Sequence, residues 1–155
     1  MKIAVIQIRG GVGMNAKVKR TLNLLRLYRK HCCAIIDGTP SNIGMLRRVK
    51  DFITWGEISK ETLKHLLEKR GRLPGNVLLT EKYVEEKLKM KLDKFAEELF
   101  TDKKSFKDLP GLKQFFRLNP PRKGFGVKGV KLPFSMGGAL GYRKDTINDL
   151  IERML

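Results

Sequence analysis

A short glycine motif near the N-terminus is the first place where residue types and spacing suggest chemistry. Gly11, Gly13 and Ala16 fit the pattern G-x-G-x-x-G/A, after a strand-like run from Ile3 to Ile8 and before a helical pattern. In dinucleotide-binding folds this spacing lets the backbone approach a pyrophosphate, and an acidic residue that ends the next strand binds the ribose. Asp37 has that position in the sequence. The motif predicts either a dinucleotide site or a flexible loop that presents backbone amides to another phosphate.

The residues around this motif favour the phosphate-binding loop. Only one more strand pattern follows Asp37 before the sequence becomes mainly helical, so the sheet is too small for a dinucleotide fold. Asp37 also precedes Gly38-Thr39-Pro40, which is typical of a turn or a helix start. A second formal match, from Gly124 to Gly129, opens no helix, and neither glycine cluster contains the Gly-Lys-Ser/Thr of a P-loop.

The titratable side chains show no pattern for catalysis or metal binding. His31 and His65 are isolated in the sequence, and the serines lack the surroundings of a nucleophile elbow. The only cysteines, Cys32 and Cys33, are adjacent, which disfavours a disulfide and predicts small apolar strand residues in a reducing compartment. We therefore expect no catalytic residue, no metal site and no cofactor.

Positive charge dominates the composition. The chain has 155 residues and a net charge of +17, from 33 Lys and Arg against 16 Asp and Glu. Residues 1–36 and residues 109–144 each contain eight basic side chains and no acidic one, whereas residues 37–108 are nearly balanced. Such a surplus predicts a polyanionic partner. The N-terminus lacks the anatomy of a signal peptide, and no uncharged run reaches the ~20 residues of a membrane helix.

Hydrophobic periodicity predicts an α+β chain. Strands over 3–8, 32–37 and 52–57 alternate with a basic helix and with a second helix that Thr39 caps, with Pro40 at its first position. We expect 1–57 to form a β-α-β-α-β core and 58–155 to form an extension. Within the extension, 59–108 are predicted to be helical, 109–144 to be an extended, Gly- and Pro-rich basic segment, and 145–155 to be a final helix capped by Asp145.

Several longer motifs carry a family resemblance. They are the strand Cys32-Cys33-Ala34-Ile35-Ile36-Asp37, the helix with Met45-Leu46-Arg47-Arg48-Val49, then Thr54-Trp55-Gly56, Leu66-Leu67-Glu68-Lys69-Arg70-Gly71, Pro121-Arg122-Lys123-Gly124 and Gly137-Gly138-Ala139-Leu140-Gly141-Tyr142-Arg143-Lys144-Asp145-Thr146-Ile147-Asn148. Together they resemble the large-subunit ribosomal protein family numbered thirty, whose eukaryotic members carry the number seven. The resemblance covers essentially the whole chain, which is similar to the long archaeal form of the family. Tyr142 stands where the family commonly has Asn.

This resemblance implies a ferredoxin-like core with a small three-stranded antiparallel sheet and helices on one face. It also implies a non-catalytic protein that binds and stabilises folded large-subunit ribosomal RNA in the cytoplasm, within the ribosome. The implied partners are that RNA, with 5S RNA as a further candidate, and neighbouring ribosomal proteins, without a membrane or an obligate homo-oligomer.

Basic side chains, exposed glycine amides and one aromatic ring form the predicted RNA-binding set, because cations neutralise phosphates and an aromatic ring can stack on a base. The set is Arg9, Gly10, Gly11, Lys17, Lys19, Arg20, Arg26, Arg47, Arg48, Lys50, Arg70, Arg122, Lys123, Phe125, Lys128 and Arg143. We also expect the segment from Arg122 to Arg143 to become ordered only against RNA. A small dinucleotide-binding enzyme and a free-standing RNA-binding regulator remain open as alternatives.

Overall fold

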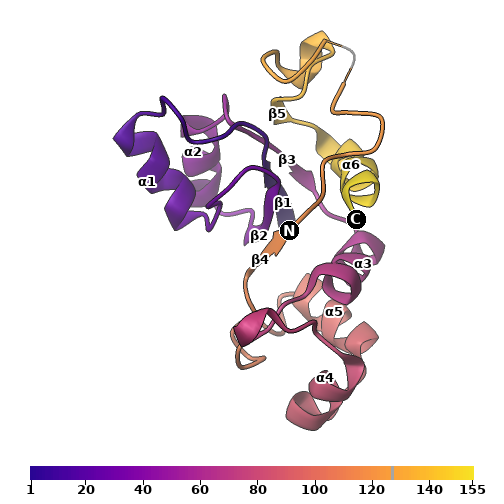
Figure 1. Cartoon of the computed structure of the whole chain (residues 1–155). Helices are drawn as coiled ribbons and strands as arrows, with labels where there is room; N and C mark the ends of the chain where they lie inside the picture. Colours follow the sequence, from indigo (N-terminus) through magenta and orange to yellow (C-terminus); the bar gives the residue numbers. More distant parts are fainter. Residues whose placement is uncertain (127) are drawn as a thin grey trace.

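The computed structural model describes residues 1–126 and 128–155, and it has one mixed sheet with helices on both sides (Figure 1). The strands are β1 (Lys2–Gln7), β2 (Cys32–Asp37), β3 (Ile53–Glu57), β4 (Phe115–Arg117) and β5 (Gly141–Tyr142). The helices are α1 (Ala16–Leu24), α2 (Pro40–Arg48), α3 (Lys60–Arg70), α4 (Glu81–Leu88), α5 (Leu92–Phe100) and α6 (Ile147–Met154), with short 3-10 turns at η1 (Pro74–Asn76), η2 (Phe134–Met136) and η3 (Lys144–Thr146). The prediction of an α+β chain is confirmed.

The sheet contains the predicted three strands and two more. Its order is β4-β2-β1-β3-β5, and β1 pairs antiparallel with both β2 and β3. The three antiparallel strands expected for the core are confirmed, but the sheet is larger than expected because the basic segment adds a strand at each edge. β4 pairs antiparallel with β2, and β5 pairs parallel with β3.

Both faces of the sheet are covered: the core helices α1 and α2 lie on one face, as expected, and helices of the extension cover the other. Side chains alternate between the two faces of a strand, and every residue of β1 is buried. Ile3 and Val5 face a cluster with α1 and α2, whereas Ala4 and Ile6 face a larger cluster with α3, α5 and α6. Coverage on both sides explains why β1 is apolar almost throughout rather than alternating with polar residues.

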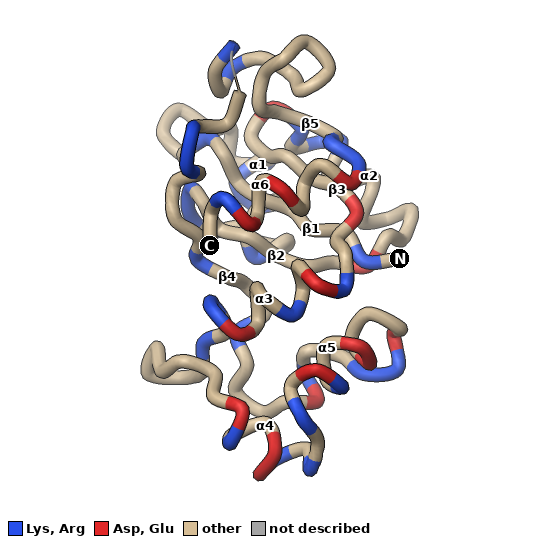
Figure 2. The backbone as a smooth tube through the Cα atoms, turned by 90° about the vertical axis from the view of Figure 1, so that its right-hand side faces the viewer, with Lys and Arg blue, Asp and Glu red and all other residues tan. Residues whose placement is uncertain are grey.

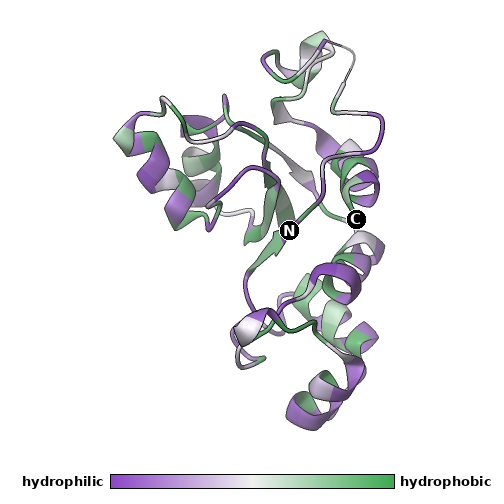
Figure 3. Cartoon of the chain, viewed as in Figure 1, coloured by the Kyte–Doolittle hydropathy of each residue, from purple (hydrophilic) through white to green (hydrophobic). Residues whose placement is uncertain are grey.

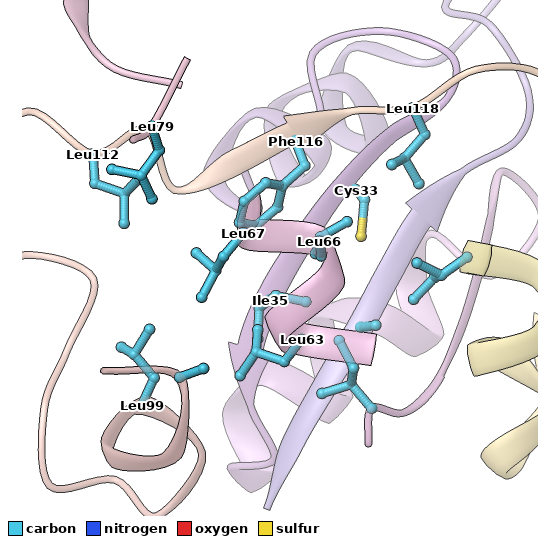
Figure 4. Packing of buried hydrophobic residues seen from close by; sticks show 14 of the residues in the cluster. Cys33, Ile35, Leu63, Leu66, Leu67, Leu79, Leu99, Leu112, Phe116 and Leu118 are labelled. Carbon is cyan, nitrogen blue, oxygen red and sulfur yellow. The ribbon is translucent and has the colours of Figure 1, made fainter. Parts of the chain in front are cut away.

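The larger cluster joins the N-terminal strands to the rest of the chain. Figure 4 shows α3 at its centre, with Leu66 beside Cys33 of β2, Leu67 beside Phe116 of β4, and Leu63 beside Ile35 of β2. Phe116 has no exposed surface, and its ring meets that of Phe106 in a T-shaped arrangement with centroids 6.3 Å apart. In Figure 3, α4 and α5 each carry both hydrophobic (green) and hydrophilic (purple) residues, as helices do that pack by one side only.

Side-chain caps set the starts of α1, α2 and α3, whereas α4, α5 and α6 begin without one. Thr39 accepts a hydrogen bond from the Asn42 amide at 3.3 Å, and Ser59 accepts one from the Thr62 amide at 3.2 Å. The predicted Thr39 cap with Pro40 at the first position is confirmed. The predicted Asp145 cap is wrong, because Asp145 lies inside η3 and α6 begins after it without a side-chain cap.

The C-terminal motif closes onto the third strand. A Cβ on Gly56 would lie 2.1 Å from the Lys144 carbonyl oxygen, so only glycine allows this approach. Asn148 donates to the Glu57 carbonyl at 3.0 Å and accepts from the Ser59 amide at 2.9 Å. The Tyr142 hydroxyl contacts the Glu57 carboxylate, which raises the pKa of Tyr142 to about 12. The longest resemblance motif therefore builds the fold by binding β3.

Candidate RNA-binding surface

The pairing of the strands contradicts the dinucleotide alternative. Lys2 pairs with Asp37 across the antiparallel β1 and β2, which places Asp37 beside the start of β1. Gly11 follows the other end of β1, so the glycine loop and Asp37 lie at opposite ends of this strand. A dinucleotide site needs parallel strands that present the loop and the acid at the same end. The carboxylate of Asp37 instead accepts from the Lys2 ammonium at 2.6 Å.

The loop after β1 presents backbone to solvent. A Cβ added at Gly10, Gly11 or Gly13 would have no heavy atom within 4 Å, and Gly13 has a φ of +70°. Arg9 is half-buried, its guanidinium 5.0 Å from the Phe52 ring centroid and donating to the Asp51 carbonyl at 3.2 Å. This anchoring holds one charge at the base of an open loop.

Helices α1 and α2 carry the predicted cations of the N-terminal block on their outer side. Their inner residues pack on the sheet, and the exposed cations are Lys17, Lys19, Arg20, Arg26, Arg47, Arg48 and Lys50. Neither helix contains an acidic residue. Arg26 follows the end of α1 at a φ of 59°, which turns the chain back toward β2. α1 and α2 lie on the same face of the sheet (Figure 1), and the seven exposed cations lie on these helices or directly after them.

The second basic block forms a separate projection. Arg122, Lys123 and Lys128 are exposed on the segment that leads to η2, and Figure 2 shows it free of red. Its backbone bonds to itself, because Ala139 and Leu140 both donate to the Leu132 carbonyl at 2.9 and 3.1 Å. The second glycine motif includes Val127, which lies outside the described residues. That this segment is ordered only against RNA stays a prediction.

Arg143 differs from the other predicted residues because it is buried. Only 4% of it is exposed, and its guanidinium donates to Thr54 Oγ1 at 2.9 Å and to the Ala139 carbonyl at 3.0 Å. It also lies 4.6 Å from the centroid of the Phe134 ring. Burial, with a smaller effect of Arg153, lowers the pKa of Arg143 to about 10. This position is contrary to the prediction that Arg143 contacts RNA, since the charge is directed into the fold.

Phe125 and Arg70 are half-buried. The Phe125 ring stacks on His31 with centroids 5.7 Å apart and an interplanar angle of 8°. Burial, and then Lys30, lower the pKa of His31. Arg70 donates to the Leu155 carbonyl at 2.9 Å. Both side chains therefore contribute to packing as well as to the surface.

The sequence did not single out three cations near β4, namely Arg72, Lys113 and Arg117. They come together only when β4 pairs with β2. A strand of three residues is too short for hydrophobic alternation to be detected in the sequence. The one available signal was the absence of acid in 109–144. Both cysteines are buried, and burial raises the pKa of each thiol, as expected for apolar strand residues.

The acidic residues are concentrated elsewhere. Figure 2 shows red and blue mixed along α3, α4 and α5, where Lys64 pairs with Asp93 at 2.8 Å and Lys60 pairs with Glu97 at 2.6 Å. In the described residues, no helix is long and apolar enough to cross a membrane, and no three potential metal ligands cluster. The fold and its exposed cations define a class of small α+β proteins with strongly basic faces.

Comparison with known proteins places the chain within this class. Residues 3–53 match the family described as "Ribosomal protein L30p/L7e". The whole chain is 46% identical to all 155 residues of "Large ribosomal subunit protein uL30" of Methanococcus maripaludis. The proteins of the same name from Methanopyrus kandleri and Nanoarchaeum equitans are 44% and 46% identical, over 96% and 98% of this chain and 100% and 97% of their own lengths. The chain belongs to the uL30 family of ribosomal proteins.

Proposed function

We propose that this protein is a structural constituent of the large ribosomal subunit, and that it binds and stabilises folded ribosomal RNA without catalysing a reaction. Membership of the uL30 family supports the first part. The single observation that supports the second is the acid-free outer side of α1 and α2. Its site of action would then be the ribosome in the cytoplasm, with ribosomal RNA and adjacent ribosomal proteins as partners.

The proposed contact surface has three parts. The loop from Arg9 to Gly11 offers backbone amides, the exposed cations of α1 and α2 offer charge, and Arg122, Lys123 and Lys128 extend from the second basic block. Contacts of these kinds fix orientation on phosphates rather than read base sequence. We therefore expect recognition of a folded RNA shape, with 5S RNA as one candidate contact.

The acid-free face is more than an ordinary solvated surface. The only acidic residue in 1–50 is Asp37, and Lys2 already pairs with it at 2.6 Å. The cations on α1 and α2 thus repel one another without internal compensation. A polyphosphate relieves that repulsion and releases its own counterions on binding.

The test replaces Lys17, Lys19 and Arg20 with Ala and measures binding to large-subunit ribosomal RNA over a range of salt concentrations. Each lost phosphate contact is expected to flatten the slope of log K against log salt by about 0.7–0.9. The matched control replaces Lys82, Lys87 and Lys94, which are exposed on α4 and α5. Equal slopes for the two triple variants would remove α1 from the interface.

A free-standing RNA-binding regulator would use the same surface, and sedimentation separates it from a ribosomal protein. We expect the chain to travel with large subunits through moderate salt. Recovery of the chain only in the soluble fraction, with RNA binding intact, would favour the regulator.

A further inference from the structure

A cleft beside β4 collects positive charge from parts of the chain that are far apart in sequence. Its volume is about 310 Å³, and Arg70, Arg72, Asn76, Lys113, Phe115 and Arg117 line it. Four of these six side chains are cationic, and none is acidic. This cleft lies along the edge strand β4, next to β2 (Figure 1), rather than on the outer side of α1 and α2.

The backbone around this cleft is fixed by pairing and packing. Lys113 donates its amide to the Arg72 carbonyl at 3.0 Å, which joins the approach to β4 to the end of α3. The backbone of Arg72 also forms an isolated antiparallel β-bridge with that of Leu78. Leu73, Leu112 and Phe116, which are neighbours of Arg72, Lys113 and Arg117 in the sequence, are buried in the core, so packing anchors the backbone that carries these three cations.

The charges in the cleft have no acidic partner within the described residues. Arg72 donates to the Asn76 carbonyl at 3.0 Å, and one nitrogen of Arg70 donates to the Leu155 carbonyl. The Nε of Arg70 is buried without a hydrogen-bond partner. A buried donor without an acceptor is costly, and like charges that share a cleft disfavour one another. An anion in the cleft would relieve the repulsion among these cations.

A second cleft continues the first. Its volume is about 420 Å³, and it shares the side chains of Phe115 and Arg117 while adding Tyr28, Arg29 and Lys30. Tyr28 is 54% exposed, and its ring meets that of Phe115 edge to face with centroids 5.3 Å apart. The two clefts together therefore contain cations, the exposed ring of Tyr28 and the partly buried ring of Phe115.

We propose that the two clefts form one groove for a single-stranded segment of RNA. The β4 groove, as we name it, consists of Tyr28, Arg29, Lys30, Arg72, Lys113, Phe115 and Arg117 with their neighbours in the two clefts. Its cations bind successive phosphates, and Tyr28 or Phe115 stacks on an unpaired base. Sequence-tolerant binding of single strands combines these two features, whereas a duplex keeps its bases from stacking on protein rings. An acidic protein segment would use the charge but leave the rings without a role.

This inference rests on the proposed function for the chemical class of its partner, but it assigns a different surface. It implies that the chain holds a folded RNA on the side of α1 and α2, and an unpaired strand along β4. Charged side chains at a sheet edge also prevent edge-to-edge association, which is the simpler role. That role needs charges on the edge strand alone, whereas the groove gathers them from three segments, 28–30, 70–72 and 113–117.

The test uses the full chain and a 12-nucleotide oligouridylate. The variant Arg72→Gln, Lys113→Gln, Arg117→Gln removes three groove cations, and Lys82→Gln, Lys87→Gln, Lys94→Gln is the control of equal charge. We expect the groove variant to flatten the salt dependence of oligouridylate binding by about 2, at ~0.7 per contact with a single strand. The control keeps the slope of the wild type. Tyr28→Ala, with all cations present, is expected to weaken binding roughly 10-fold.

Three results would overturn the proposal. The first is an equal change in slope for the groove variant and the control. The second is oligouridylate binding that is indifferent to Tyr28→Ala and to Phe115→Leu. The third is tighter binding of polyglutamate than of oligouridylate of the same charge, which would make the groove a site for an acidic protein segment. The proposed function has a separate test, the salt slope of the Lys17, Lys19 and Arg20 variant on folded ribosomal RNA. A slope equal to that of its control would count against the proposed function, and it would not change the oligouridylate results.

Discussion

Replacing Arg143 with Ala separates a structural role from an RNA-binding one. The guanidinium donates to Thr54, to the Ala139 carbonyl and, at 3.2 Å, to the Phe125 carbonyl, and it lies over the Phe134 ring. Removal leaves acceptors without a donor in a place that is almost closed to water.

The expected loss of stability follows from these contacts. An unsatisfied buried polar group costs about 1–3 kcal/mol, and a desolvated cation–π contact contributes about 2 kcal/mol. Desolvation of Arg143, seen in its lowered pKa, offsets part of this gain. We therefore expect the free energy of unfolding to fall by about 3 kcal/mol, which moves a urea midpoint by about 1.5 M at a typical slope of ~2 kcal/mol per M.

The assay combines urea unfolding followed by circular dichroism with the salt dependence of RNA binding. Arg143→Ala should lower the midpoint and, where the chain is folded, leave the salt slope unchanged. Arg122→Ala is the control from the same segment, since Arg122 is exposed and should change the slope by about 0.7–0.9 with little effect on stability. An unaltered urea midpoint, together with a flatter salt slope for Arg143→Ala, would refute the structural assignment.

Three further predictions concern the packing of the fold. Phe116→Ala should lower the free energy of unfolding by about 3–5 kcal/mol, since this ring is fully buried, and calorimetry measures it; a loss below about 1 kcal/mol would contradict the packing. Asp102→Asn should lower the urea midpoint at neutral pH. The hydrogen bond from Lys2 lowers the pKa of Asp102, so its stabilising effect is present above pH 3.8 and is lost as the pH falls through the lowered value; a difference that persists in acid would be inconsistent with this pair. Residues 1–57 alone should not fold, because Ala4, Ile6, Cys33 and Ile35 would lose their cover; dispersed amide resonances for that fragment would disprove the single shared core.

Much of the N-terminal half could be predicted because its signals are local. The strand patterns of residues 3–8 and 32–37, the Thr39 cap and the inward residues of α1 and α2 all depend on neighbours within a few positions. The end of the first helix was less predictable: α1 ends at Leu24, and Tyr28 lies beyond it with its ring against Phe115 of β4. Helix ends depend on a few tenths of a kcal/mol per residue, which periodicity does not resolve.

The edge strands and the role of Arg143 could not be predicted because they depend on contacts across the chain. β5 contains two residues, and its pairing with β3 joins positions that are almost ninety apart, as the 87-residue separation of Thr54 and Gly141 shows. An arginine in an acid-free segment has the same sequence signature whether it faces phosphate or Thr54. Only the closure of the last motif onto β3 distinguishes these cases.

The most direct test of RNA binding by the exposed basic faces is a protein–RNA crosslinking map of intact large subunits. We expect crosslinks from the loop after β1, from the outer side of α1 and α2, and from the segment 122–128. Few or none are expected from α4 and α5, where acidic and basic residues are mixed. Crosslinks confined to α4 and α5, with α1 and α2 unmodified, would contradict the proposed function.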